Sequence, residues 1–175
     1  MKEQKKGLII IFTGEGKGKT TAALGMALRA IGHHLKVFII QFIKGKWQSG
    51  ELKAVKGMSN LSILPMGSGF ICKEKSRDRE KKMALEAWDL CRKKIESKEY
   101  DMVIMDEINY AIHYNLLNLD DVISFLKNKP KKIHIVLTGR NAKPELIEIA
   151  DIVTEMRDIK HSYRRGMKAQ KGIEY

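Results

Sequence analysis

The sequence predicts a three-layer α/β sandwich, in which helices cover both faces of a mostly parallel central sheet. Short continuous apolar runs alternate with longer stretches of helical periodicity, which is typical of parallel strands joined by helices. The apolar runs do not alternate with polar residues, so both faces of the strands are expected to be buried. The length of 175 residues suits a single domain, predicted to span residues 1–175.

Four buried strands are predicted from β-branched and apolar runs, at residues 7–13, 37–42, 102–105 and 133–138. Two shorter runs, at residues 61–64 and 152–153, are further candidates. Their continuous apolar character is typical of strands that are covered on both faces. These runs therefore supply the strands of the predicted sheet.

Four helices are predicted between these strands. The first runs over residues 19–31 and stops at Gly32, and the second covers residues 76–97, where Trp88 and Cys91 lie on one apolar stripe. A third starts at residue 120 and ends before Pro130, and a fourth follows Pro144. Residues 44–60 and 66–75 are rich in Gly, Ser and Lys. We predict loops there, beyond strand ends, where open α/β sheets bind ligands.

Composition excludes several classes of protein. With 43% hydrophobic and 31% charged residues, the chain is too apolar to be disordered, and it has no apolar run of the ~20 residues that a membrane helix needs. No secretory signal pattern precedes the first strand, and Cys72 and Cys91 lack metal-binding spacing. We expect reduced thiols and a cytoplasmic protein. The net charge of +12 implies an anionic partner: nucleic acid, a membrane surface or a phosphorylated substrate.

A glycine-rich loop between the first strand and the first helix narrows that choice. It is nearly a Walker A phosphate loop, displaced by one residue at its first glycine. Glycines let several N–H groups turn toward phosphate oxygens, and the start of a helix adds its positive dipole end. Lys19 supplies a mobile positive charge and the Thr20 hydroxyl can ligate Mg²⁺. The residues expected to bind ATP here are Gly14, Glu15, Gly16, Lys17, Gly18, Lys19, Thr20 and Thr21.

A second motif supplies carboxylates. The apolar run at residues 102–105 ends in Asp106 and Glu107, as a Walker B strand does. One carboxylate can hold Mg²⁺ (or Mn²⁺) directly or through water, and the other can orient a group or accept a proton. Thr20, Asp106 and Glu107 are therefore the predicted metal-binding residues, and Lys19 and Glu107 are predicted to be catalytic.

Two other functions share parts of this pattern. A nucleic-acid-associated ATPase would explain the net charge and the basic tail at residues 157–171, although no aromatic stacking set accompanies the basic residues. A small-molecule kinase would share the phosphate loop and would transfer only the γ-phosphoryl group. The composition of the tail fits either a solvated segment or a flap that grips an anion.

Beyond these motifs, the sequence resembles the ATP:corrinoid adenosyltransferases of the phosphate-loop type, also described as cob(I)alamin or cob(I)yrinic acid a,c-diamide adenosyltransferases. The family loop Gly-x-Gly-Lys-Gly-Lys-[Ser/Thr]-Thr-Ala-Ala matches residues 14–23, displaced glycine included. The other matching segments are residues 41–45, Trp47, 50–51, 66–70, 105–107, 138–140, 150–155, 160–161 and 168–175. The ordered set of matches makes the resemblance specific.

The resemblance implies a P-loop NTPase (RecA-like) fold and a defined reaction: the 5′-deoxyadenosyl group of ATP moves to Co(I) of a reduced corrinoid, and triphosphate leaves. It implies adenosylcobalamin synthesis in the cytoplasm by a homodimer supplied with electrons by a flavodoxin-type reductant, without nucleic acid or membrane as a partner. The nucleotide is expected to lie reversed in the loop relative to ordinary ATPases.

The resemblance also assigns two side chains to the lower face of the corrin, where they displace the axial ligand and ease reduction of cobalt. The first position matches Phe70, which is expected to take part in catalysis. The second, usually an aromatic residue such as tryptophan, is Cys72 here. The preferred corrinoid, whether cobalamin, cobinamide or cobyrinic acid diamide, is left open by these residues.

Overall fold

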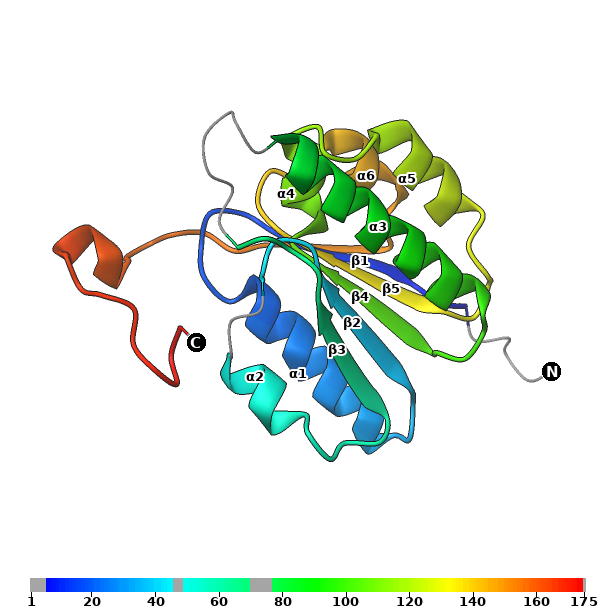
Figure 1. The fold of residues 1–175 in the computed structure, drawn as a ribbon, viewed down its shortest axis with the longest axis horizontal. Helices are drawn as coiled ribbons and strands as arrows, with labels where there is room; N and C mark the ends of the chain where they lie inside the picture. The colour runs from blue at the N-terminus through cyan, green and yellow to red at the C-terminus, as the bar shows by residue number, and fades with distance from the viewer. Residues whose placement is uncertain (1–5, 46–48, 70–76, 175) are drawn as a thin grey trace.

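The computed structural model describes residues 6–45, 49–69 and 77–174, and it confirms the predicted three-layer α/β architecture (Figure 1). Its elements in chain order are β1 (Ile9–Thr13), α1 (Lys19–Gly32), β2 (Val37–Gln41), α2 (Gly50–Ala54), β3 (Leu61–Pro65), α3 (Arg77–Glu96), β4 (Met102–Asp106), α4 (Ile108–His113), α5 (Leu119–Lys127), β5 (His134–Thr138), α6 (Pro144–Ile149), β6 (Ile152–Glu155) and a 3₁₀ turn (Ser162–Arg165).

The sheet has six parallel strands in the order β3-β2-β4-β5-β1-β6. All six predicted runs form strands, and the short run at 152–153 extends to Glu155 as the edge strand β6. Because the strands are parallel, their carboxyl ends meet along one side of the sheet. This side, formed by the ends of β1, β2, β4 and β5, is called the carboxyl edge below, and the opposite side is the amino edge.

Two separate apolar cores explain why the strand sequences are continuously apolar. Ile9 and Ile11 of β1 point into the core beneath α3, α4, α5 and α6, whereas Ile10 and Phe12 point into the core beneath α1. Figure 1 shows α1 and α2 on one face of the sheet and the other helices on the opposite face. Strands covered on both faces need apolar residues at every position.

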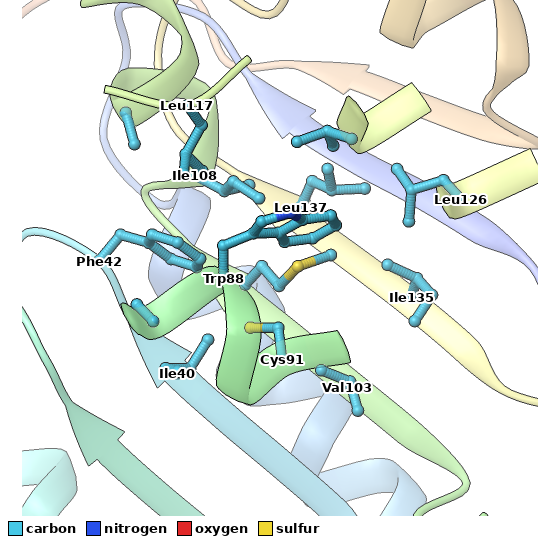
Figure 2. Close-up of a cluster of buried hydrophobic side chains, with 14 of the residues drawn as sticks. Ile40, Phe42, Trp88, Cys91, Val103, Ile108, Leu117, Leu126, Ile135 and Leu137 are labelled. Atoms are coloured by element: carbon cyan, nitrogen blue, oxygen red, sulfur yellow. The ribbon is translucent and has the colours of Figure 1, made fainter. Parts of the chain in front are cut away.

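Trp88 and Cys91 belong to the larger core, as their places on the helical stripe predict. Figure 2 shows both side chains of α3 pointing among apolar residues of the strands. Trp88 stacks edge-on against Phe125 at 5.3 Å between ring centroids. Complete burial raises the pKa of the Cys91 thiol well above its ordinary value, so this cysteine is a packing residue with little thiolate character.

Two short helices were not predicted from the sequence. Residues 44–60 were expected to be a loop, but α2 forms within them; it has five residues and no buried side chain, so no apolar stripe marks it. Helix α4 follows Glu107, which adopts a left-handed backbone conformation with φ of 65°. That conformation is uncommon for a residue other than glycine, and nothing in the sequence indicates it. The other helices agree with their predicted ranges to within one or two residues.

The chain after β6 runs along the phosphate loop. This segment, residues 156–174, is called the C-terminal arm; it extends beyond the sheet on the side of the loop between β1 and α1 (Figure 1). Among the described residues, the Gly16 N–H donates a hydrogen bond to the Met156 carbonyl at 2.7 Å and Lys17 forms an ion pair with Glu174, and both contacts tie the arm to the loop. No helix in the described part of the chain is long and apolar enough to span a membrane.

Candidate active site

The phosphate loop connects the end of β1 to the start of α1, as the sequence predicts. Gly14 and Gly18 have φ of 94° and 108°, a region that side-chain-bearing residues rarely adopt. Gly18 is the residue that immediately precedes α1. The helix therefore begins at Lys19 with its first N–H groups at the loop, an arrangement that attracts anions.

Gly16 has a second role, which the sequence does not reveal. A Cβ atom at this position would lie 2.7 Å from the carbonyl oxygen of Arg157, closer than real side chains allow. The N–H of Gly16 donates a hydrogen bond to the Met156 carbonyl. Gly14 has this role too, since a Cβ there would lie even closer to the carbonyl oxygen of Met156. Gly14 and Gly16 thus both permit the C-terminal arm to lie against the loop.

Lys19 lies across the loop and is almost completely buried. Its Nζ donates hydrogen bonds to the carbonyls of Gly14 at 2.8 Å and Gly16 at 2.6 Å. Burial lowers the pKa of Lys19, and the charge of Arg140 lowers it further, whereas the carboxylate of Glu107 opposes both effects. The ammonium group is therefore held at the loop with few competing water molecules, where its attraction for a phosphate is strongest.

Asp106 is the centre of a buried hydrogen-bond network at the end of β4. Its Oδ1 accepts hydrogen bonds from the hydroxyls of Thr20 at 2.8 Å and Thr138 at 2.7 Å. Its Oδ2 accepts one from the Gln41 amide at 3.1 Å. The Walker A hydroxyl and the Walker B carboxylate, predicted from motifs 86 residues apart, are therefore in direct contact.

Glu107 lies beside Asp106 but in a different environment. Its backbone N–H donates to the Thr138 hydroxyl at 2.9 Å, and its left-handed backbone directs the chain into α4. Burial raises the pKa of Glu107, and the neighbouring Asp106 raises it further, while Lys19 and Arg140 lower it. Left-handed residues outside glycine cost about 1–3 kcal/mol and concentrate at functional sites, which agrees with a role for this carboxyl group.

The donor atoms at this place fit a magnesium ion that is also held by phosphates. Thr20 and Asp106 offer hydroxyl and carboxylate oxygens, which Mg²⁺ prefers. Gln41 adds a buried Oε1 that has no hydrogen-bond partner among the described residues and is suited to accept from a metal-bound water. Within the described ranges no three acidic, His or Cys side chains form a metal-binding group, so the protein alone provides only part of a coordination shell. Mg²⁺ bound to nucleotides commonly has such partial protein shells.

The remaining predicted residues of the loop point to solvent or to the arm. Lys17 forms an ion pair with Glu174 of the C-terminal arm, at 2.7 Å between Nζ and Oε1. Glu15 pairs with Arg140, at 3.3 Å between Oε2 and Nε. Thr21 is exposed in the first turn of α1. Phe70 and Cys72, the predicted corrin-facing residues, lie outside the described residues.

Three side chains join the site without having been predicted as site residues: Gln41, Thr138 and Arg140. Gln41 and Thr138 are the last residues of β2 and β5, and Arg140 follows β5 by two residues. The carboxyl ends of parallel strands lie along the same edge of a sheet. Polar residues at the ends of the other predicted strands could therefore have been predicted as site residues together with the Walker B carboxylates. In the sheet Gln41 is the direct register partner of Asp106.

Comparison with known proteins places this geometry in a family. The family described as ATP:corrinoid adenosyltransferase BtuR/CobO/CobP matches residues 5–175. A corrinoid adenosyltransferase of Sinorhizobium sp. is 45% identical, over 99% of this chain and 83% of that protein. The corrinoid adenosyltransferase CobA of Salmonella typhimurium is 38% identical, over 99% of this chain and 88% of its own.

A solved structure supports the fold alone. The flagellar accessory protein FlaH of Methanocaldococcus jannaschii superposes with a TM-score of 0.54 at 18% sequence identity, over 86% of this chain and 71% of that chain. The family match extends through the phosphate loop, the Asp106–Glu107 pair and the arm. This chain belongs to the ATP:corrinoid adenosyltransferase family.

Proposed function

We propose that the protein transfers the 5′-deoxyadenosyl group of ATP to the Co(I) of a reduced corrinoid at the carboxyl edge of the sheet. The type of reaction, an ATP-dependent adenosylation in cobalamin biosynthesis, is inferred from membership of the family. The observation that supports this location is the contact between Thr20 and Asp106, because it joins a phosphate loop to a carboxylate that is suited to bind a cation.

In the proposed step, the electron pair of Co(I) attacks C5′ of ATP. The Co–C bond forms as the bond between C5′ and its ester oxygen breaks, and the electron pair leaves with triphosphate. Negative charge therefore accumulates on the leaving group, where the Lys19 ammonium, the loop amides and the N-terminal end of α1 stabilise it. Thr20 and Asp106 would hold Mg²⁺ or Mn²⁺, which when bound neutralises phosphate charge.

Each buried polar residue has a positioning task in this proposal. Thr138 and Gln41 fix the Asp106 carboxylate through hydrogen bonds at 2.7 Å and 3.1 Å, so that it cannot rotate away from the cation. Glu107, whose pKa is raised by burial, would orient a water molecule of the bound cation. Phe70, and Cys72 two residues after it, are proposed to contact the lower face of the corrin.

The proposal includes partners and a location that follow from the family resemblance. We propose a homodimer in the cytoplasm, supplied with electrons by a flavodoxin-type reductant. Nucleic acid and membranes are not proposed as partners. The positive charge near the loop, including Lys44 paired with Glu51 at 2.6 Å, serves ATP and the polar rim of the corrinoid instead.

Product analysis tests the reaction. Anaerobic incubation of the protein with chemically reduced cobalamin and Mg-ATP is expected to yield adenosylcobalamin and triphosphate in equal amounts. ADP and phosphate without a Co–C bond would refute the proposal and favour a kinase or an ATPase. Stimulation of ATP hydrolysis by DNA or RNA, together with salt-dependent binding, would favour the nucleic-acid-associated ATPase.

The corrin-facing role of Phe70 has its own test. Phe70→Ala should weaken the reduction of bound cob(II)alamin, because a water or ligand can return to the lower face of cobalt. ATP binding, measured by calorimetry, should be unchanged. A cob(II)alamin spectrum that is identical in the variant and the wild type, with the protein and ATP bound, would contradict this role.

A further inference from the structure

Arg140 lies next to the phosphate loop. It belongs to the segment after β5, whereas the two Walker motifs lie at the ends of β1 and β4. It follows Gly139, whose φ is 124° and where an added Cβ would lie 3.1 Å from Oε2 of Glu107. The fully buried Asn109 donates its side-chain amide to the Gly139 carbonyl at 3.2 Å. The backbone at Arg140 is therefore held against the site, while its side chain is half-exposed.

The guanidinium of Arg140 is paired with a carboxylate on the phosphate loop, where a carboxylate is unexpected. Glu15 puts a carboxylate on a loop whose glycines, helix dipole and lysines all attract anions, and the Arg140 Nε lies 3.3 Å from that carboxylate. Both side chains are more than half exposed, at 53% for Arg140 and 62% for Glu15. An ion pair so exposed to solvent contributes little to stability. Stabilisation of the fold therefore does not explain why these two side chains are paired.

The field of Arg140 reaches the centre of the site. Its positive charge lowers the pKa of Lys19 and that of Glu107, although burial and other charged groups have larger effects on both. Both groups belong to the proposed ATP site. Arg140 thus reaches the glycine-rich loop from the segment that follows β5.

We propose that Arg140 is a catalytic residue that contacts the triphosphate, and that Glu15 competes with the triphosphate for its guanidinium. This inference rests on the proposed binding of ATP at the phosphate loop. The planar fork of arginine binds two oxygens of one phosphate at once. As the C5′–O bond breaks and charge accumulates on the leaving triphosphate, Arg140 exchanges a carboxylate for a more highly charged oxyanion.

A simpler role for Arg140 would be to neutralise Glu15 without touching the substrate. The two roles predict different results for a double variant. If Arg140 only neutralises Glu15, then Glu15→Gln removes the need for it, and adding Arg140→Ala to Glu15→Gln changes nothing. If Arg140 contacts the triphosphate, the arginine remains necessary when Glu15 is absent.

The experiment is a calorimetric titration of inorganic triphosphate with Mg²⁺ into the wild type, Arg140→Ala, Glu15→Gln and the double variant. We expect Arg140→Ala to bind about 10- to 100-fold more weakly, the effect of losing a hydrogen-bonded charge. Glu15→Gln should bind about 3- to 10-fold more tightly, since the competitor is gone. The double variant should remain at least about tenfold weaker than Glu15→Gln.

Equal affinity of the double variant and Glu15→Gln would overturn the inference. Arg140→Lys serves as the conservative variant and should recover only part of the affinity, because an ammonium lacks the fork. Arg29→Ala removes a positive charge from the exposed last turn of α1, roughly 15 Å along the helix from Lys19, and should bind as the wild type does. The difference between these two arginines excludes a general charge effect.

Lys19→Ala, titrated in parallel, separates this inference from the proposed function. A weakened Lys19→Ala with an unaffected Arg140→Ala would overturn the role of Arg140 alone. If Lys19→Ala bound triphosphate like the wild type, the proposed site itself would be wrong. In turnover assays, Arg140→Ala should lower kcat as well as raise KM for ATP, because the contact strengthens as the leaving group gains charge.

Discussion

The two edges of the sheet each hold a lysine that donates to two backbone carbonyls. At the carboxyl edge, Lys19 donates to Gly14 and Gly16; at the amino edge, Lys129 donates to Gly7 and Ile133, both at 2.8 Å. Burial lowers the pKa of both lysines. The contacts are chemically alike, so the difference in function must come from the surroundings.

Those surroundings differ in the backbone segments that each lysine joins and in whether the neighbouring carboxylate already has a basic partner. The carbonyls that bind Lys19 belong to one glycine loop, and the carboxylates of Asp106 and Glu107 lie nearby without an ion pair to it. The carbonyls that bind Lys129 belong to two different segments, so that lysine ties the start of β1 to the start of β5. The acid near it, Asp151, is already bound to the N–H of Ile9 and to Lys6. We infer that Lys129 maintains the fold and that Lys19 serves the substrate.

The largest expected effect is on turnover in Lys19→Ala. Removing the ammonium leaves the charge of the departing triphosphate without its buried cation, and we expect a loss of about 10²–10³-fold in kcat. Because Lys19, like Lys129, donates two hydrogen bonds to backbone carbonyls, the free energy of unfolding should also fall, by about 1–2 kcal/mol. Anaerobic formation of the Co–C bond, followed by absorbance, together with urea unfolding, measures both quantities. Turnover near that of the wild type would remove Lys19 from the mechanism.

Asp106→Asn should produce the next largest loss. The variant keeps the shape of Asp106 but removes the charge that attracts the cation. It also replaces one acceptor oxygen by an N–H₂ donor, which would face the donor group of Thr20, Thr138 or Gln41. We expect turnover to fall by about 10²-fold and the Mg²⁺ concentration for half-maximal activity to rise. An unchanged dependence on Mg²⁺ would show that the cation is held elsewhere. Asp101→Asn, at an exposed position before β4, is the matched control.

Lys129→Met should differ from Lys19→Ala in turnover and not in stability. Methionine keeps most of the apolar stem and removes the two hydrogen bonds, so the free energy of unfolding should fall by about 1–2 kcal/mol. Turnover per folded molecule should equal that of the wild type, because the amino edge is remote from the phosphate loop. The comparison fails if this variant loses turnover while its stability is unchanged.

A smaller effect is expected on the pH dependence of stability at Glu107. Because burial raises its pKa in the folded state, the folded protein binds this proton more tightly than the unfolded chain does. Stability from this group is therefore greatest at low pH and is lost as the pH rises through the folded pKa. Glu107→Gln should melt at a higher temperature than the wild type at pH 7, and the difference should shrink below about pH 4.5, the ordinary pKa of the group. A lower melting temperature for the variant at pH 7 would contradict this assignment.

Features that depend on neighbouring residues could be predicted from the sequence. Continuous apolar runs such as Ile9–Thr13 predict buried parallel strands, and the order of strand, glycines, lysine and helix predicts the phosphate loop. The placement of Asp106 beside Thr20 also follows, because a Walker B strand ends at the same edge of the sheet. These predictions rest on local pattern and on one rule of topology.

Features that depend on distant parts of the chain were not predicted. The reason for a glycine at position 16 is the carbonyl of Arg157, which approaches only once β6 has paired with β1. The ion pair between Glu15 and Arg140 joins residues that are far apart in the sequence, and neither side chain carries a signal of the other. Helix α4 depends on the left-handed backbone of Glu107, which packing imposes and local sequence does not favour.

The most direct test of this account measures the Co–C bond and triphosphate in the same anaerobic sample, for the wild type, Lys19→Ala and Lys129→Met. The wild type and Lys129→Met are predicted to form the two products in equal amounts at equal rates per folded molecule, and Lys19→Ala is predicted to form almost none of either. Equal activity of the two lysine variants would contradict the account.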